Sequence, residues 1–304
     1  MSDLFNYKNK TSTLASTMKN VGTKVEKDSS RTMSQETFEL MRETVYKLSG
    51  IYYTDQKKYL LESRISKRLA ENNIKTFEEY HKLINSINGR SELNQLFEAI
   101  TINETFFFRA DHQFNALEKI LIPEILEKKN LTGDKFRIWS AASSTGEEAY
   151  TIAIIINEIF KPRYPNIQFE IIASDINNKV LQQARQATYK DYAVRNMPDS
   201  LKNKYFTKDG NLWQLDNSIR SMVKFMNINL YDSMKMRAMT SFDIIFCCNV
   251  LIYFDLNSKQ KVVGHLYDSL NEGGYLFIGY SESLHGVSKA FSLVHLPKAM
   301  AYKK

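Results

Sequence analysis

The sequence predicts an α/β fold in which a mostly parallel sheet covered by helices is preceded by a domain made only of helices. Apolar residues recur at helical spacing throughout residues 34–100. Strand-like runs alternate with helices from about residue 135 to the end of the 304-residue chain. Turn signals within residues 190–222 also predict a small antiparallel β lobe inserted into the α/β domain.

Four short helices with brief links are expected in the helical domain. Their start and stop signals are Gly50 at the end of the first helix, Thr54 at the start of the second, Thr76 with Glu79 as a capping box for the third, and Ser91 at the start of the fourth. A connector with a linking helix, residues 101–134, leads from there into the α/β domain, residues 135–304.

The α/β domain should contain five main strands joined by right-handed crossovers. They are expected at residues 135–141, 168–174, 222–228, 242–248 and 274–280. Within the inserted lobe, Asp209-Gly210 predicts a hairpin and Asp216-Asn217 a second turn.

Composition narrows the classes of protein that fit. The chain is 43% hydrophobic and 25% charged, an ordinary globular balance, and it has no run of about 20 apolar residues as a membrane helix requires. Residues 1–33 are rich in Ser, Thr, Lys and Asn and lack a signal-peptide core, so we expect a disordered tail and a cytoplasmic protein. Five Lys and one Arg against three acids give this tail +3 of the net charge of +7, which weakens a nucleic-acid interpretation.

The first predicted strand-to-helix turn, IWSAASSTGEEAYTIA, should face the ligand crevice, because ligands of open parallel sheets bind at the carboxyl ends of the strands. It lacks both common glycine-rich phosphate motifs. Glu147 and Glu148 would repel a pyrophosphate and favour a ligand with positive charge. The alternative is that both acids only stabilise the helix through its dipole, by about 0.3–1 kcal/mol each.

Asp175 ends the next predicted strand, where an acid typically accepts hydrogen bonds from ribose hydroxyls. Its alternative role is the N-cap of the following helix. A ligand that suits both turns is an adenosine without phosphates, and S-adenosylmethionine, with its ribose, sulfonium and ammonium, is such a ligand.

Five segments in order make the chain resemble the CheR family of chemotaxis receptor methyltransferases. They are TINETFFFRADHQF, IWSAASSTGEEAYTIA, IIASDINNKVLQQAR, FDIIFCCNVLIYFD and NEGGYLFIGYSESL, within a resemblance that spans residues 34–304. It implies a class I S-adenosylmethionine-dependent methyltransferase fold. It also implies methyl transfer to glutamate side chains in the cytoplasmic domains of methyl-accepting chemotaxis receptors, with S-adenosylhomocysteine as the product.

The resemblance also implies the residues that contact the cofactor. They are Asn103, Thr105, Arg109, Glu147, Asp175, Asn229, Leu230, Cys248 and Asn249. The chain departs from the family at Cys248, where arginine is usual, and at Ala149, where proline is usual.

A glutamate acceptor has a pKa of about 4.3 and is ionised at neutral pH, so the reaction needs positioning rather than a general base. Arg109 is expected to hold or neutralise the acceptor carboxylate, and Tyr253 to orient it with its hydroxyl. The alternatives are a surface charge for Arg109 and an aromatic packed on the sheet for Tyr253.

The second helix offers a surface for the receptor. Lys57, Arg64 and Arg68 fall within about 40° of one another at 100° per residue. They predict either a basic face that docks acidic receptor helices or an ordinary solvated face. The inserted lobe looks compact, so we expect it to bind no receptor tail peptide.

Two competing functions remain open at this stage. A nucleic-acid methyltransferase commonly carries an Asn/Asp-Pro-Pro-Tyr/Phe motif where this chain has NVLIY. An inactive receptor-binding module that senses the cofactor is supported only by Cys248. Adjacent residues on a strand point to opposite faces, so Cys247 and Cys248 are expected to be packing residues, and no metal site is predicted.

Overall fold

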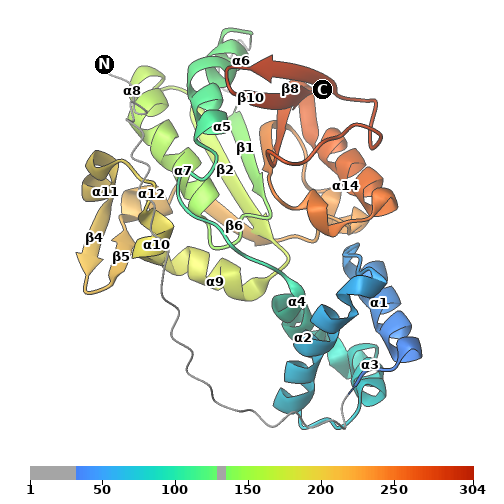
Figure 1. Cartoon of the computed structure of the whole chain (residues 1–304). Helices are drawn as coiled ribbons and strands as arrows, with labels where there is room; N and C mark the ends of the chain where they lie inside the picture. The colour runs from blue at the N-terminus through green and yellow to red at the C-terminus, as the bar shows by residue number, and fades with distance from the viewer. Residues whose placement is uncertain (1–31, 129–134) are drawn as a thin grey trace, which may run out of the picture.

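The computed structural model describes residues 32–128 and 135–304, and Figure 1 shows a group of helices beside a larger part built on a sheet. Of the predicted tail, residues 1–31 lie outside the described residues. The prediction that the disordered tail reaches residue 33 is wrong at Met33, which is only 2% exposed and packs in the core of the helices. Residues 129–134 of the predicted connector also lie outside the described residues.

The N-terminal helices are α1 (Gln35–Ser49), α2 (Lys58–Glu71), α3 (Phe77–Ile84) and α4 (Arg90–Ile100). Gly50 ends α1 in the left-handed conformation, with φ of 74°, and Thr76 and Glu79 form the predicted capping box of α3. These helices share a core that includes Phe38, Leu61 and Tyr80.

Two predicted helix starts are wrong, because a short 3-10 turn precedes each helix. The turn Asp55–Lys57 leads into α2, and the Thr54 side chain makes no capping hydrogen bond. The turn Ile87–Gly89 leads into α4, where Gly89 occupies the N-cap position and Ser91 is already inside the helix.

The α/β part contains a seven-stranded sheet in the order β6-β2-β1-β7-β8-β10-β9. The five predicted strands are confirmed, and each pairs parallel with its neighbour within this group. β10 pairs antiparallel with both β8 and β9. The bounds are β1 (Lys135–Ala141), β2 (Gln168–Asp175), β6 (Val223–Asn227), β7 (Phe242–Cys247), β8 (Leu270–Ile278), β9 (Ser292–Leu296) and β10 (Ala299–Lys303).

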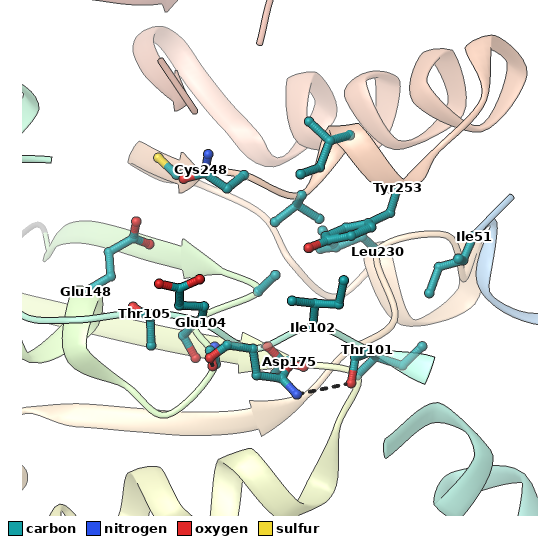
Figure 2. A pocket seen from close by; sticks show the side chains of 18 of the residues that line it. Ile51, Thr101, Ile102, Glu104, Thr105, Glu148, Asp175, Leu230, Cys248 and Tyr253 are labelled. Atoms are coloured by element: carbon teal, nitrogen blue, oxygen red, sulfur yellow. Dashed lines mark hydrogen bonds between the residues drawn. The ribbon is translucent and has the colours of Figure 1, made fainter. Parts of the chain in front are cut away.

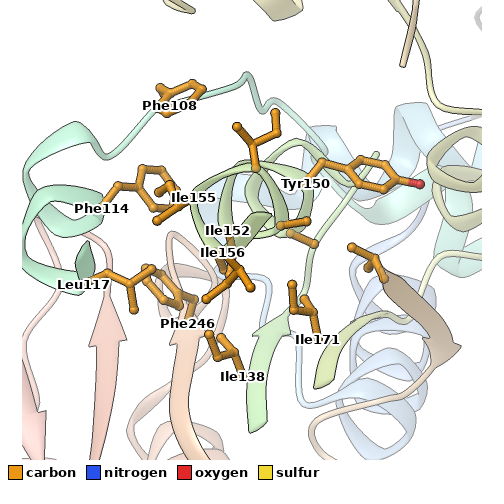
Figure 3. Close-up of a cluster of buried hydrophobic side chains, with 14 of the residues drawn as sticks. Phe108, Phe114, Leu117, Ile138, Tyr150, Ile152, Ile155, Ile156, Ile171 and Phe246 are labelled. Atoms are coloured by element: carbon orange, nitrogen blue, oxygen red, sulfur yellow. The ribbon is translucent and has the colours of Figure 1, made fainter. Parts of the chain in front are cut away.

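Both faces of the sheet are buried because successive residues of a strand point to opposite sides. On β1, Ile138 joins the cluster formed with α5 (Asp111–Ala116) and α7 (Glu147–Ile155), which Figure 3 shows packed on the sheet. The next residue, Trp139, joins the other cluster with α14 (Leu256–Ser269). The remaining helices of this part are α6 (Ile122–Lys128), α8 (Lys161–Arg163), α9 (Asn178–Gln186) and α13 (Ser233–Met236).

The predicted β lobe is confirmed as a three-stranded antiparallel sheet in the order β3-β5-β4. Gly210, with φ of 56°, makes the hairpin between β4 and β5. Asp216 does not make a simple turn, because its side chain caps a one-turn helix. The elements are β3 (Thr188–Lys190), α10 (Asp191–Val194), α11 (Asp199–Tyr205), β4 (Phe206–Asp209), β5 (Leu212–Leu215) and α12 (Asn217–Arg220).

None of the helices in the described parts of the chain combines the length and the apolar character needed to cross a membrane.

Candidate functional site

A pocket of about 230 Å³ lies at the carboxyl ends of β1, β2, β6 and β7. The strand order reverses between β1 and β7, and such a switch point is where open α/β sheets bind ligands. The connector that follows α4 forms one wall. The segment just after α1, including Ile51, closes the pocket from the helical part (Figure 2).

The loop between β1 and α7 forms part of the pocket wall and has an unusual backbone. Ala142 and Ser144 have φ of 65° and 50°, a region that residues with side chains rarely occupy. Gly146 has φ of 93°, and a Cβ there would lie 3.1 Å from the Ala184 Cβ and the Phe225 Cζ, so glycine lets the loop pack against its neighbours. The Ser143 hydroxyl is buried in the pocket lining with no hydrogen-bond partner in the described structure. Strain and an unpaired polar group in one loop are typical of a ligand site.

Asp175 lies at the end of β2 and lines the pocket. One carboxylate oxygen accepts from the Ser144 backbone N–H and the other from the Asn177 backbone N–H, each at 2.9 Å. Its alternative role is wrong, because the Asn177 side chain caps α9 by accepting from Val180 N–H. Burial raises the pKa of Asp175 to about 6. The carboxyl is still largely ionised at neutral pH, and each oxygen has a second lone pair, so it can accept a hydrogen bond at the predicted ribose position.

Of the two acids at the start of α7, Glu148 lines the pocket and Glu147 does not. The cofactor contact that was predicted at Glu147 is therefore corrected to Glu148. Glu148 lines the pocket (Figure 2), where its Oε1 accepts from the Ser140 hydroxyl at 2.7 Å. Glu147 is 3% exposed, bonds to the Thr145 hydroxyl and is not part of the lining. Consecutive helical residues point about 100° apart, so only one of the pair can face the cavity. Burial raises the pKa of each carboxyl to about 7.

The ends of β6 and β7 bring four further predicted residues to the pocket, namely Asn229, Leu230, Cys248 and Asn249. Leu230 and Asn229 both line it, but the Asn229 amide donates to the Leu48 carbonyl at 2.7 Å and so fastens the end of α1. Cys248 also lines the pocket, and its thiol donates to Gln113 Oε1 at 3.4 Å. Cys248 is therefore more than a packing residue, whereas Cys247 is fully buried as predicted. Burial raises the pKa of both thiols, which keeps them neutral.

The connector supplies the residues near the mouth. The side chain of Arg109 is exposed, and its Nη1 donates to the Glu104 carbonyl at 2.7 Å. The Asn103 carbonyl accepts from the Ser144 hydroxyl at 2.9 Å, which joins the connector to the loop after β1. Tyr253 is half-buried in the lining (Figure 2), and burial raises its pKa. The alternative prediction, that Tyr253 only packs on the sheet, is therefore wrong.

The structure thus brings most of the predicted site together. The predicted residues that line this one pocket are Asn103, Thr105, Arg109, Asp175, Asn229, Leu230, Cys248, Asn249 and Tyr253. The sequence-based prediction missed Ser143, which lies inside the first turn and could have been found there, and Ser49 and Ile51, which no motif marks.

The predicted basic face of α2 does not form as expected. Arg68 is only 9% exposed, and its Nε and Nη2 bind the two oxygens of Glu92 at 2.8 and 2.7 Å. Lys57 is exposed, and Arg64 is half-buried with Nη1 donating to the Tyr53 hydroxyl. Arg68 therefore holds the helices together and is not a docking residue.

Comparisons with known proteins match both parts of the chain. Residues 36–101 match the family model described as the CheR methyltransferase all-alpha domain. Residues 103–300 match the model of the CheR methyltransferase SAM-binding domain. The chain belongs to the CheR methyltransferase family. The predicted resemblance, the class I methyltransferase fold and S-adenosylmethionine as the cofactor are therefore confirmed.

Curated members of the family cover most of the chain. Chemotaxis protein methyltransferase 2 of Vibrio cholerae is 35% identical over 86% of this chain and 91% of its own length. The chemotaxis protein methyltransferase of Borreliella burgdorferi is 36% identical over 80% of this chain and 86% of its own length. Chemotaxis protein methyltransferase Cher2 of Pseudomonas putida is 33% identical over 88% of this chain and 97% of its own length. The chain thus spans the relatives that it matches nearly end to end.

The pocket of this CheR methyltransferase fits the family's cofactor. Asp175 and Glu148 are buried carboxyls with raised pKa values, so they favour a cationic group and oppose a phosphate. The unpaired Ser143 hydroxyl can bond a polar group of the ligand.

Protonation of Glu148 should weaken cofactor binding. We expect the affinity advantage of the wild type over Glu148→Gln for S-adenosylmethionine to fall about ten-fold between pH 8 and pH 6. The carboxyl, with a pKa of about 7, must lose its proton to pair with the cation. Isothermal titration calorimetry of both proteins at both pH values measures this ratio, in which the ligand's own titration cancels.

A ratio of affinities that does not change with pH would show that Glu148 does not pair with the cation.

The raised pKa of Glu148 changes the free energy of unfolding of the cofactor-free protein in the opposite direction, because this free energy falls as the pH rises. A carboxyl whose pKa rises on folding stabilises the folded state below its unfolded pKa of about 4.5, and this contribution is lost as the pH rises through about 7.

Proposed function

We propose that this enzyme transfers the methyl group of S-adenosylmethionine to glutamate side chains in the cytoplasmic domains of chemotaxis receptors, forming glutamate methyl esters. The observation that carries the proposal is that an exposed arginine and a tyrosine line the same pocket as the two buried carboxyls. An acceptor carboxylate that enters from solvent would meet the Arg109 guanidinium and the Tyr253 hydroxyl. These three relatives are all named chemotaxis protein methyltransferases, which supports the same substrate class.

Positioning supplies the catalysis in this proposal. Bound S-adenosylmethionine would provide a methyl group activated by its sulfonium. Asp175 would hold the ribose, and Glu148 would pair with positive charge on the cofactor. Because a glutamate acceptor is already ionised at neutral pH, the enzyme needs to orient one carboxylate oxygen toward the methyl carbon. In this proposal Arg109 and Tyr253, which both line the pocket, orient the acceptor.

The arginine must not stabilise the acceptor too strongly, because a tightly paired carboxylate attacks less readily. Arg109 meets this requirement, since it is exposed and its Nη1 already donates to the Glu104 carbonyl. The burial-raised pKa of Tyr253 keeps its hydroxyl protonated and able to donate.

A methyl-transfer assay tests the substrate class directly. Receptor cytoplasmic fragments and bulk RNA are each incubated with the enzyme and methyl-labelled S-adenosylmethionine. We expect label on the receptor fragments, released as methanol in base because carboxyl methyl esters hydrolyse there. Label on RNA would contradict the proposal in favour of a nucleic-acid methyltransferase. Cofactor binding without transfer would favour a sensor.

Lys57 and Arg64 remain candidates for receptor contact after Arg68 is excluded. Lys57 is exposed in the 3-10 turn just before α2, and Arg64 donates to the carbonyl of Ile100, a residue of the pocket lining. The positive charges of Lys57 and Arg64 are complementary to an acidic receptor helix.

Removing both charges should weaken receptor recognition and leave the cofactor pocket intact. We expect Lys57→Ala with Arg64→Ala to raise the KM for receptor fragments about ten-fold, with a much smaller change in the affinity for S-adenosylhomocysteine. Lys67→Ala, which removes another exposed charge of α2, is the control and should behave as the wild type. An unchanged KM in a folded double variant would refute this docking surface.

That the inserted lobe binds no receptor tail peptide stays a prediction. Its strands β4 and β5 are four residues long each. A titration with receptor tail peptide decides it, and micromolar affinity would contradict the prediction.

A further inference from the structure

The segment after β7 supplies a large share of the pocket wall and is held in a strained conformation. Cys248, Asn249 and Tyr253 from this segment all line the pocket. Asn249 has φ of 61°, a left-handed conformation that costs free energy in a residue with a side chain. Such a conformation persists only where neighbouring groups hold it.

The group that holds it is the carboxylate of Glu282, which lies beyond β8. Glu282 is 8% exposed, and its Oε2 accepts from the backbone N–H of Asn249 at 2.9 Å. The same oxygen accepts from Gly279 N–H at 2.6 Å, and Oε1 accepts from Ile252 N–H at 3.2 Å. One carboxylate thus joins the segment after β8 to both ends of the segment 249–252.

The close approach of the two segments depends on a glycine. A Cβ at Gly279 would lie 2.7 Å from Glu282 Oε2 and 2.9 Å from the Asn249 backbone nitrogen, both too close for a real side chain. Glycine at 279 therefore lets the carboxylate reach the Asn249 amide. Glu282 itself does not belong to the pocket lining, so it can act on the pocket only through the segment that it holds.

We propose that Glu282 is a positioning residue that fixes the segment 248–253 in the shape that the cofactor pocket requires. The inference rests on the proposed use of that pocket. Its carboxylate satisfies three backbone donors and offsets the strain at Asn249, so the wall is formed before the ligand arrives. Preorganisation of this kind improves binding by removing the ordering cost.

The matched pair Glu282→Gln and Glu272→Gln tests the inference in the cofactor-free protein. An amide of the same size can accept with only one of its two end atoms, so Glu282→Gln should lose at least one backbone hydrogen bond. Glu272 lies on β8 with its side chain 87% exposed, and replacing it removes a carboxylate without touching the segment. Hydrogen-exchange mass spectrometry follows peptides that span residues 248–253.

We expect exchange in these peptides to be about ten-fold faster in Glu282→Gln than in the wild type, and unchanged in Glu272→Gln and in the peptides of β1 and β2. The affinity for S-adenosylhomocysteine and the KM for S-adenosylmethionine should each worsen about ten-fold, with a smaller change in kcat. A residue that only supported the fold would speed exchange across the whole sheet and leave the KM unchanged.

Unchanged exchange at residues 248–253, or faster exchange spread over the whole sheet, would overturn the inference. If Glu282→Gln does not fold, Gly279→Ala replaces it, because it keeps the carboxylate and crowds the Asn249 amide. Unchanged exchange in that variant would equally overturn the inference. A wild type that binds no S-adenosylhomocysteine would contradict the proposed pocket, while the exchange result would still decide the role of Glu282.

Discussion

Asparagine in place of Asp175 is expected to weaken the binding of S-adenosylmethionine and S-adenosylhomocysteine about 100-fold. Each carboxylate oxygen already accepts a backbone N–H, from Ser144 and from Asn177. An asparagine side chain would turn an NH2 group toward one of these donors and would also lose an acceptor for the ribose. Hydrogen bonds to a charged group contribute about 1.5–3 kcal/mol each, and a 100-fold loss is about 2.7 kcal/mol, so the loss of the charged acceptor for the ribose accounts for the expected effect.

Calorimetry with both ligands at pH 8 measures the effect, at a pH where the Asp175 carboxyl, with a pKa of about 6, is ionised. Asp216→Asn is the matched control, because Asp216 is an exposed cap of α12 in the β lobe, away from the pocket. A dissociation constant within about three-fold of the wild type in a folded Asp175→Asn protein would remove Asp175 from the cofactor site.

Arg109→Ala should lower kcat/KM for receptor methylation about 100-fold, with a much smaller effect on the affinity for S-adenosylhomocysteine. The exposed guanidinium lies at the pocket mouth and Nη1 donates to the Glu104 carbonyl, so the arginine is held in place but remains open to the acceptor. Its loss removes both the charge and the orienting donor for the acceptor carboxylate.

Steady-state assays on receptor fragments check this expectation. Arg163→Ala, which removes an exposed arginine on α8 outside the pocket, should leave kcat/KM unchanged. If Arg109→Ala retains kcat/KM within about three-fold of the wild type, the acceptor carboxylate does not depend on Arg109 for its orientation.

The sheet could be predicted from the sequence because its central parallel strands, β1, β2 and β7, are short apolar runs that are largely buried on both faces. Asp175 could be predicted for a related reason, since a strand end fixes the position of the residue that ends it. Asn229, Cys248 and Asn249 were implied only by the family resemblance, and the structure places them in the pocket lining just after β6 and β7. A residue at a strand end needs no side-chain detail to be placed at the crevice.

Side-chain direction was the part that the sequence could not supply. Glu147 and Glu148 are adjacent and chemically alike, and only the rotation of α7 decides that Glu148 faces the pocket. Arg68 fits a basic face by spacing, yet Glu92 on another helix draws it into the interior. The contact partners of such residues come from distant parts of the chain, which local periodicity does not report.

The helix starts that were predicted at Thr54 and Ser91 are wrong for a different reason. A polar residue before a helix is a good cap only if the helix begins directly after it. A 3-10 turn separates Thr54 from α2, whereas the turn before α4 ends at Gly89, so that the helix begins at Arg90 and already contains Ser91. Ser49 and Ile51 entered the site unpredicted because the packing of the helical part against the sheet brings them there.

A crystal structure of the protein with bound S-adenosylhomocysteine tests the central claim most directly, because it shows whether this carboxylate-lined pocket holds a phosphate-free adenosine. We predict the ribose hydroxyls within hydrogen-bonding distance of the Asp175 carboxylate and the ligand's ammonium on the side of Glu148. A ligand bound elsewhere, or a ribose that makes no contact with Asp175, would contradict the account.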